Sequence, residues 1–247
     1  MRSFSMTDKG KMRHSNQDFL FVSETPVGTL PNLFVVADGM GGHNAGDYAS
    51  RYAVEVMVET IRNSTETEPA ALFVQAVWEA NRCLLERAGE DARLSGMGTT
   101  AVLACICQNR LWTANIGDSR LYRVNDSILQ VTRDHSLVEE MVRNGELKEA
   151  EARIHPDKNI ITRAVGATKD ADPDIFETEL SQGDRILMCS DGLTNMVTDQ
   201  EILTIMKDEP EPEQTVRTLI NAANLNGGKD NITAIVIAPF YGEVTIC

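Results

Sequence analysis

Five aspartates stand at the ends of apolar stretches, and four of them lie beside glycine-containing turns. They are Asp38 after LFVVA, Asp118 after WTANIG, Asp191 after RILMCS, Asp230 before the last apolar run, and Asp18 at the start of DFLFV. An ionised carboxylate at the mouth of an apolar core is costly unless it is compensated. Two like charges roughly 4 Å apart repel by about 4 kcal/mol at an effective dielectric near 20. If these strand ends converge, their hard oxygen ligands select Mg²⁺ or Mn²⁺.

Turn chemistry is the alternative explanation for these residues. Asp-Gly and Asn-Gly are common turn formers, so any one aspartate at a strand end is explained without a ligand. Four of them beside long apolar runs favour metal binding, because solvated hairpin turns do not need so consistent a choice of Asp. A glycine next to a ligand also lets a backbone carbonyl approach an ion without a Cβ clash.

The elements that must position these aspartates follow from hydrophobic periodicity. Strands are predicted at 3–6, 19–23, 33–37, 98–107, 110–116, 120–124, 128–131, 176–180, 185–189 and 232–238. Helices are predicted at 46–62, 69–88, 199–206 and 212–223, with one or two short helices within 136–165. Short connections make 98–131 an antiparallel meander. The pattern predicts one α+β domain over 1–247, with two sheets and helices outside them.

Charge and cysteine usage exclude several classes of protein. The chain carries 23 Lys+Arg against 37 Asp+Glu, a net charge of −14, with no basic cluster. We therefore expect neither nucleic-acid nor membrane-surface binding. No apolar run approaches the ~20 residues that span a bilayer, and the N-terminus lacks a signal-peptide core. The five cysteines contain no C-x-x-C pair, which predicts a reduced, cytoplasmic protein.

Seven short motifs occur in one order along the whole chain. They are Arg13-x-x-Asn16-Gln17-Asp18, Val36-Ala37-Asp38-Gly39-Met40-Gly41-Gly42-His43, Gly96-Met97-Gly98-Thr99-Thr100, Gly117-Asp118-Ser119-Arg120, Thr132-x-Asp134-His135-Ser136, Ser190-Asp191-Gly192-Leu193 and Asp230-Asn231-Ile232-Thr233. Any one of them alone is weak. Together they strongly resemble the PPM (type 2C) metal-dependent Ser/Thr protein phosphatases in their bacterial form.

The resemblance implies a four-layer α-β-β-α sandwich, in which two antiparallel sheets are flanked by helix pairs. It also implies a binuclear Mn²⁺ or Mg²⁺ centre at one end of the sandwich. Asp38 matches the carboxylate that bridges both ions, and Gly39 matches the residue whose carbonyl binds one of them. Asp191 and Asp230 match ligands of the other ion. Asp118 with Asp191 resembles the third-metal site of bacterial members.

Three further residues receive roles from the resemblance. Asp18 matches an acidic residue that holds metal-bound water, behind the direct ligands. Arg13 matches the arginine that binds the substrate phosphate, a role suited to a planar, permanently charged guanidinium. Some relatives carry a His directly after the bridging Asp-Gly, where this chain has Met40. His43 is therefore our candidate for the leaving-group acid, and a metal-bound water is the alternative.

The implied reaction hydrolyses phosphoserine and phosphothreonine in proteins. Water held between two ions attacks phosphorus in line, and no phospho-enzyme forms. The implied partners are phosphorylated proteins and an opposing eukaryotic-like Ser/Thr kinase, and we expect a monomer. Residues 136–165 match the variable flap beside the family's cleft, although a plain solvated helix pair explains them equally well. The alternative functions are a non-catalytic regulatory domain that keeps the fold and a phosphatase for one dedicated regulator.

Overall fold

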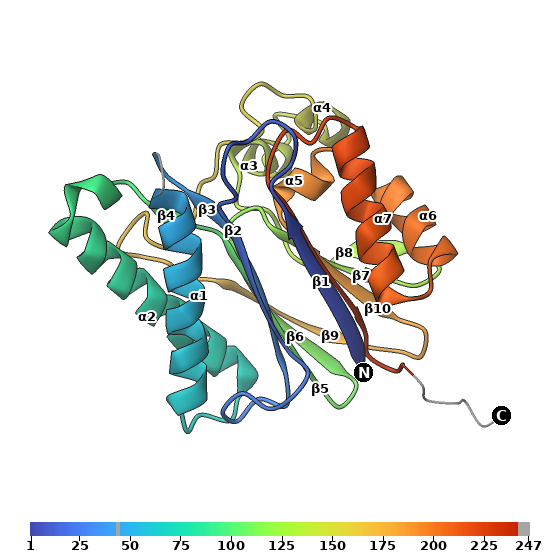
Figure 1. Cartoon of the computed structure of the whole chain (residues 1–247), viewed down its shortest axis with the longest axis horizontal. Coiled ribbons are helices and arrows are strands. Elements are labelled where there is room, and N and C mark those ends of the chain that lie inside the picture. The colour runs from blue at the N-terminus through green and yellow to red at the C-terminus, as the bar shows by residue number, and fades with distance from the viewer. Residues whose placement is uncertain (43–44, 242–247) are drawn as a thin grey trace.

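Two antiparallel sheets face each other at the centre of the structure, a computed structural model that describes residues 1–42 and 45–241 (Figure 1). The first sheet contains, in spatial order, β2 (Asp18–Ser23), β3 (Leu33–Met40), β5 (Ala101–Cys107), β6 (Arg110–Ile116) and β9 (Asp174–Glu179), with β4 (Gly98–Thr99) paired to β3. The second contains β1 (Arg2–Asp8), β11 (Ile232–Ala238), β10 (Arg185–Cys189), β7 (Arg120–Val124) and β8 (Ile128–Gln130).

Helix pairs cover the outer faces of both sheets (Figure 1). The first sheet is covered by α1 (Ala45–Asn63) and α2 (Pro69–Glu90), and the second by α6 (Asp199–Asp208) and α7 (Pro212–Leu225). Three short helices and a 3₁₀ turn complete the described chain: α3 (Leu137–Arg143), α4 (Glu149–Ala152), α5 (Asp191–Thr194) and Ala92–Leu94. The four-layer α+β sandwich expected from the sequence is confirmed. No helix within the described ranges has the length and apolarity needed to cross a bilayer.

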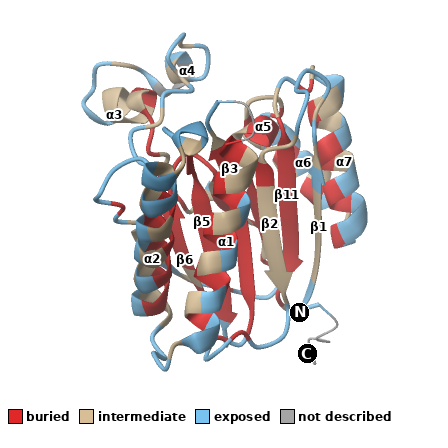
Figure 2. Cartoon of the chain, turned by 60° about the vertical axis from the view of Figure 1, so that its left-hand side comes forward, coloured by how far each residue is buried: buried red, intermediate tan, exposed pale blue. Residues whose placement is uncertain are grey.

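Three apolar clusters fill the three spaces between the four layers. Successive residues of β3 show the alternation, because Val35 packs toward α1 and α2 while Val36 packs toward the second sheet. The third cluster lies between the second sheet and its helices. The central strands are therefore buried on both faces (Figure 2), as continuous apolar runs predict. This double burial fixes the register of the strands that carry the aspartates.

The strands from β5 to β8 do not form the single meander that their short connections predicted. β5 and β6 belong to the first sheet, whereas β7 and β8 belong to the second. The chain changes sheets at residues 117–119, where Gly117 has a φ of 107° that residues with a Cβ rarely adopt. A short connection shows that two strands are close along the chain, but it does not show that they pair. The change of sheet places Asp118 at the junction between the sheets.

Gly192 allows α5 to lie directly against the start of β11. A Cβ at this position would overlap the backbone oxygen of Asn231. We expect Gly192→Ala to push these segments apart and to lower the free energy of unfolding by about 1–3 kcal/mol, the usual cost of overpacking. The control is Gly89→Ala on α2, where an added Cβ meets nothing within 4 Å. That change should raise stability by about 0.5–1 kcal/mol, and equal melting temperatures for the two variants would contradict the packing argument.

Candidate active site

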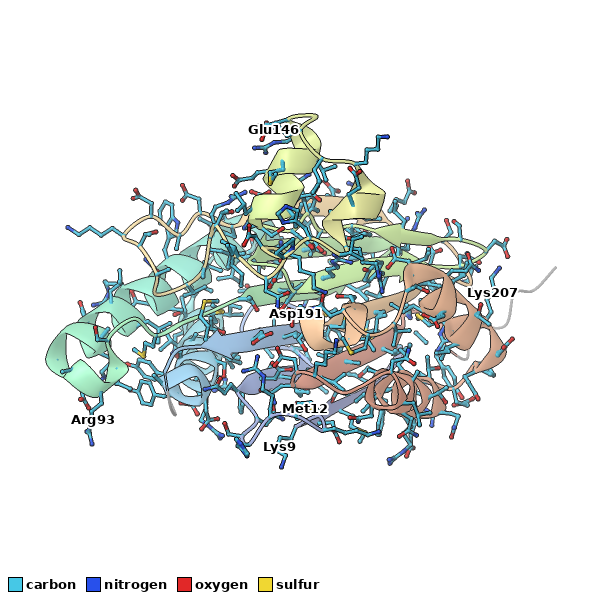
Figure 3. The ribbon with its side chains drawn as sticks, turned by 90° about the horizontal axis from the view of Figure 1, so that it is seen from above. Lys9, Met12, Arg93, Glu146, Asp191 and Lys207 are labelled. Atoms are coloured by element: carbon cyan, nitrogen blue, oxygen red, sulfur yellow. The ribbon has the colours of Figure 1, made fainter. Side chains whose placement is uncertain are left out.

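Four of the five aspartates line one cavity at the end of the sandwich. The cavity has a volume of about 230 Å³. Its lining residues are Arg13, Gln17, Asp38, Gly39, Met40, Gly41, Asp118, Asn159, Ile161, Asp191, Asp230 and Asn231. They come from segments spread over the whole chain, and Asp191 lies near the middle of the view from above (Figure 3). The fold therefore brings together at one point carboxylates that are far apart in sequence.

Asp38 is held through its backbone by two neighbouring threonines. Its amide donates to Thr100 Oγ1 at 2.9 Å, and its carbonyl accepts from Thr99 Oγ1 at 2.9 Å. Thr100 Oγ1 also lies 2.8 Å from Ser119 Oγ, next to Asp118. The threonine hydroxyls thus fix the backbone of Asp38 relative to the junction between the sheets, through the hydrogen bonds that they make.

Asp18 lies directly across the strand pair from Asp38. It is only 5% exposed. Its Oδ2 accepts hydrogen bonds from Ser190 Oγ and Thr233 Oγ1, both at 2.7 Å. Its other oxygen, Oδ1, is buried without a hydrogen-bond partner. Asp18 therefore joins the two sheets behind the cavity and keeps one oxygen available to a ligand.

Asp191 opens the short helix α5, directly after β10. Its Oδ2 accepts a hydrogen bond from Asn195 Nδ2 at 2.8 Å, whereas its Oδ1 is buried and has no partner. Asp118 is 7% exposed and borders both this cavity and a neighbouring hollow of about 660 Å³. The Oδ1 atoms of Asp191 and Asp18 are both buried acceptors without a hydrogen-bond partner. Leaving such an acceptor unpaired costs free energy of folding.

Arg13 lies at the rim of the cavity and pairs with Asp230. Its Nη2 lies 2.7 Å from Asp230 Oδ2, and Asp230 Oδ1 accepts from the Asn231 amide at 2.8 Å. About half of the Arg13 side chain is exposed, so the guanidinium sits at the rim and not inside the protein. It is well placed to exchange a carboxylate for another anion that enters the cavity.

The carboxylates disturb one another electrostatically. Burial raises the pKa of Asp18 to about 7, against the lowering effect of its hydroxyl partners. Burial, followed by the charge of Asp230, raises the pKa of Asp191 to about 6. Burial also raises the pKa values of Asp38 and Asp118 well above their ordinary range, and neighbouring aspartates raise both further. The charged forms are therefore unfavourable unless a cation compensates them.

The donor chemistry of the cavity fits a hard divalent cation. Its ionisable ligands are carboxylates, and a buried oxygen of Asp191 at the cavity has no hydrogen-bond partner, as has one of Asp18 behind it. Within residues 1–42 and 45–241, no group of three or more His, Cys, Asp or Glu side chains lies in an arrangement that could hold a metal ion. Mutual repulsion opposes such an arrangement between bare carboxylates. The cavity shared by four aspartates, the unpaired oxygens of Asp18 and Asp191 and the raised pKa values of these two residues favour a cation site.

Three further residues singled out from the sequence are Gly39, His43 and His135. Gly39 lines the cavity, and a Cβ there would overlap the backbone oxygen of Gly46, so the close approach requires glycine. His43 lies outside the described residues. His135 packs against the sheet junction, where its Nδ1 accepts from the Gly117 amide at 3.2 Å and its own amide donates to the Gly117 carbonyl.

Sequence reasoning assigned no role to several residues that build the site. Asn231 accepts a hydrogen bond from the Gln17 amide and donates to the carbonyls of Lys9 and Ser15, so it ties the β1–β2 loop to β11. Ser190 and Thr233 hold Asp18. Asn231 and Ser190 stand directly beside a candidate ligand and Thr233 lies in the same motif as Asp230, which is the one signal that could have indicated them.

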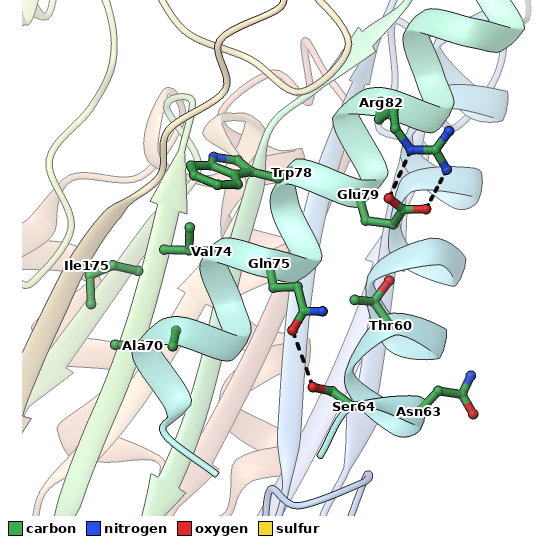
Figure 4. A pocket seen from close by; sticks show the side chains of 11 residues that line it. Thr60, Asn63, Ser64, Ala70, Val74, Gln75, Trp78, Glu79, Arg82 and Ile175 are labelled. Carbon is green, nitrogen blue, oxygen red and sulfur yellow. Dashed lines mark hydrogen bonds and ion pairs between the residues drawn. The ribbon is translucent and has the colours of Figure 1, made fainter. Parts of the chain in front are cut away.

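A larger hollow of about 910 Å³ lies over α2, away from the aspartates (Figure 4). It is open and mainly apolar near Trp78 and Val74. Its polar groups are engaged with each other, as with Ser64 and Gln75 at 3.3 Å, or Arg82 and Glu79. No cluster of carboxylates lines it, so size alone does not identify the site, and the smaller cavity carries the chemistry.

The family model described as Protein phosphatase 2C matches residues 11–233. The chain belongs to the protein phosphatase 2C family. The resemblance stated from the seven motifs is therefore confirmed, and the motif aspartates lie on the matched segment.

Individual relatives support membership of the protein phosphatase 2C family. Serine/threonine phosphatase stp of Listeria innocua is 40% identical over 236 residues, covering 94% of this chain and 93% of that protein. Serine/threonine phosphatase Stp1 from Staphylococcus aureus superposes with a TM-score of 0.89 at 35% identity, covering 96% and 94% of the two chains. The catalytic domain of phosphatase PstP, solved in complex with two manganese ions, gives 0.84 at 32% identity, covering 95% and 96%.

Removing divalent cations should make stability depend on pH in a defined direction. The folded state holds the protons of Asp18 and Asp191 more tightly than the unfolded chain does, with pKa values of about 7 and about 6. Their contribution to stability is therefore complete below the ordinary Asp pKa of 3.8 and is lost as pH rises through these values. We expect the melting temperature in chelator to be lower near pH 7.5 than near pH 5.

Added Mn²⁺ should restore the wild-type melting temperature near pH 7.5, because binding to the folded state alone stabilises it. The matched variant is Asp38→Asn, which removes a carboxyl whose own pKa is raised well above its ordinary range by burial and by the neighbouring aspartates. It should show a smaller loss between the two pH values and a smaller response to Mn²⁺. A wild-type melting temperature that rises with pH in chelator and ignores Mn²⁺ would contradict this account.

Proposed function

We propose that this chain is a metal-dependent protein phosphatase that hydrolyses phosphoserine and phosphothreonine. The observation that carries the proposal is the convergence of Asp38, Asp118, Asp191 and Asp230 on one cavity, with Arg13 at its rim. Relatives of about 40% identity that bear the name serine/threonine phosphatase support the same function. The substrates are then phosphorylated proteins, and the opposing enzyme is a eukaryotic-like Ser/Thr kinase.

Two Mn²⁺ or Mg²⁺ ions would be held by residues that already line the cavity. Asp38 and the carbonyl of Gly39 would serve one ion, and Asp38, Asp191 and Asp230 the other. Asp118 and Asp191 would serve a third ion. When bound, such cations acidify water and offset the negative charge of a phosphoryl group. The carboxylates of this chain fix where that charge compensation takes place.

Arg13 acts at the rim of the cavity and Asp18 acts behind it. The Arg13 guanidinium, released from Asp230 Oδ2, binds two phosphoryl oxygens in a planar, bidentate manner. Asp18 is fixed through Oδ2 and directs its unpaired Oδ1 to orient a water molecule for in-line attack. His43 stays our candidate acid for the departing serine or threonine oxygen. These groups bind and orient, which is the main protein contribution in phosphoryl transfer.

A non-catalytic domain that keeps the fold is the other candidate function. Such a domain would be expected to have lost ligand carboxylates, since function depends on the site and not on the fold. Here each of the five aspartates is present, four at the cavity and Asp18 directly behind it. This observation favours the enzyme. A cytoplasmic location and a monomeric state stay predictions from the sequence.

Hydrolysis of a phosphothreonine peptide should require Mn²⁺ and stop in EDTA. We expect Asp38→Asn and Asp191→Asn to lower kcat/KM by more than the roughly 10–100-fold that losing an outer partner of a metal ligand costs. Glu86→Gln on the exposed face of α2 is the control and should leave the rate unchanged. Activity that survives chelation and both aspartate substitutions would disprove the proposed function.

Replacing the rim arginine should affect substrate binding more than ion binding. Loss of charge-assisted hydrogen bonds worth about 1.5–3 kcal/mol predicts that Arg13→Ala raises KM for the phosphopeptide roughly 10- to 100-fold. Binding of Mn²⁺, measured directly, should persist. The control is Arg93→Ala, whose side chain is 89% exposed and distant from the site. An unchanged KM in Arg13→Ala would remove this residue from phosphate binding.

A further inference from the structure

Two positively charged side chains of the flap segment, residues 136–165, contact α5 and its C-cap beside the cavity. Arg153 Nη2 donates to the backbone carbonyl of Thr194 at 3.1 Å. Lys158 Nζ donates to the side-chain oxygen of Asn195 at 2.7 Å. The two contacts involve neighbouring residues of α5 and its C-cap, but they differ in kind. One ends on the backbone, whereas the other ends on a side chain with a second function.

Asn195 connects the Lys158 contact to the cavity. Its Nδ2 donates to Asp191 Oδ2 at 2.8 Å, while its Oδ1 accepts from Lys158. A planar amide with its oxygen held on one side has its NH₂ group directed to the other. The Lys158 ammonium therefore selects the orientation in which Asn195 donates to Asp191. The other carboxylate oxygen, Asp191 Oδ1, is buried and has no hydrogen-bond partner.

We propose that Lys158 and Asn195 are positioning residues. They couple the contact between the flap segment and α5, called here the seated flap, to the binding of a divalent cation by Asp191. With the flap seated, the relay holds the Asp191 carboxylate so that Oδ1 faces the cavity. With the Lys158 contact broken, the amide is free to rotate and the carboxylate loses its fixed direction. The inference rests on the proposed role of Asp191 as a metal ligand.

A simple charge effect predicts the opposite sign. The positive charge of Lys158 would repel a cation near Asp191, so removing that charge alone would strengthen ion binding. The relay predicts that removing the lysine weakens ion binding, because it disturbs an outer hydrogen bond of the ligand. The two explanations can therefore be separated by one measurement. Coupling of this kind is reciprocal, so bound cation should also favour the seated flap.

The experiment measures binding of Mn²⁺ alone to the full chain, with free Mn²⁺ counted by electron paramagnetic resonance and no substrate present. Asn195→Leu keeps the shape of the side chain but removes the amide, and should weaken binding roughly 10- to 100-fold. Lys158→Met should weaken it on the order of 5-fold or more. Lys158→Arg keeps a charged donor and should bind within about twofold of wild type.

Two comparisons identify the route of the coupling. Arg153→Met breaks the other contact between the flap and α5, which does not involve the Asn195 side chain, so it should weaken Mn²⁺ binding less than Lys158→Met does. The double variant Lys158→Met/Asn195→Leu should bind no more weakly than Asn195→Leu alone, because the lysine acts through the amide. Melting temperatures in chelator establish that each variant is folded.

Protection of the flap gives an independent measurement. In wild type, Mn²⁺ should slow amide hydrogen exchange in residues 136–165, and Asn195→Leu should reduce this protection. Wild-type affinity, or tighter binding, in Lys158→Met would overturn the inference while leaving the phosphatase proposal intact. Weakening in Arg153→Met as large as that in Lys158→Met would also overturn it, because the hydrogen bond from Lys158 to Asn195 would then not be the route of the coupling. Failure of wild-type protein to bind Mn²⁺ would instead overturn the proposed metal centre.

Discussion

Repulsion among carboxylates in a confined, poorly solvated space is the constraint on which this structure depends. Two like charges at roughly 4 Å cost about 4 kcal/mol at an effective dielectric near 20, a large fraction of the 5–15 kcal/mol by which domains are typically stable. The chain places four aspartates around a cavity of about 230 Å³ and a fifth behind it. Hydrogen bonds from the surrounding framework hold these carboxylates in place, and a divalent cation between them would turn the repulsion into attraction.

Both sheets contribute to the framework around the site, and each supplies different residues. The first sheet supplies Asp38 and Asp18 on paired strands, with their backbones in fixed register. The second supplies Ser190 and Thr233, whose hydroxyls hold Asp18 across the space between the sheets. The chain passes from one sheet to the other at Asp118 itself. The site therefore lies where relative movement of the sheets would be most damaging, and buried hydrogen bonds resist that movement.

Much of this architecture could be predicted from the sequence, for identifiable reasons. Continuous apolar runs such as LFVVA specify strands buried on both faces, and the order of the seven motifs indicated that the aspartates ending such runs meet at one end of the sandwich. The pairing of β6 with β9 could not be predicted. Three residues connect β6 to β7, and a connection of that length is compatible both with a hairpin between them and with a change of sheet. Helix α5 has four residues, too few for helical periodicity. The contacts of Lys158 and Asn195 could not be predicted, because the relay depends on side-chain contacts across the fold and not on spacing.

These aspartates meet, on the proposed function, to hold divalent cations. Anomalous diffraction at the manganese edge, from crystals of the full chain grown with Mn²⁺, tests it most directly. The account predicts strong anomalous peaks in the cavity within coordination distance of the carboxylates of Asp38, Asp191 and Asp230. An anomalous map without a peak there, or with its peaks only at unrelated surface carboxylates, would contradict it.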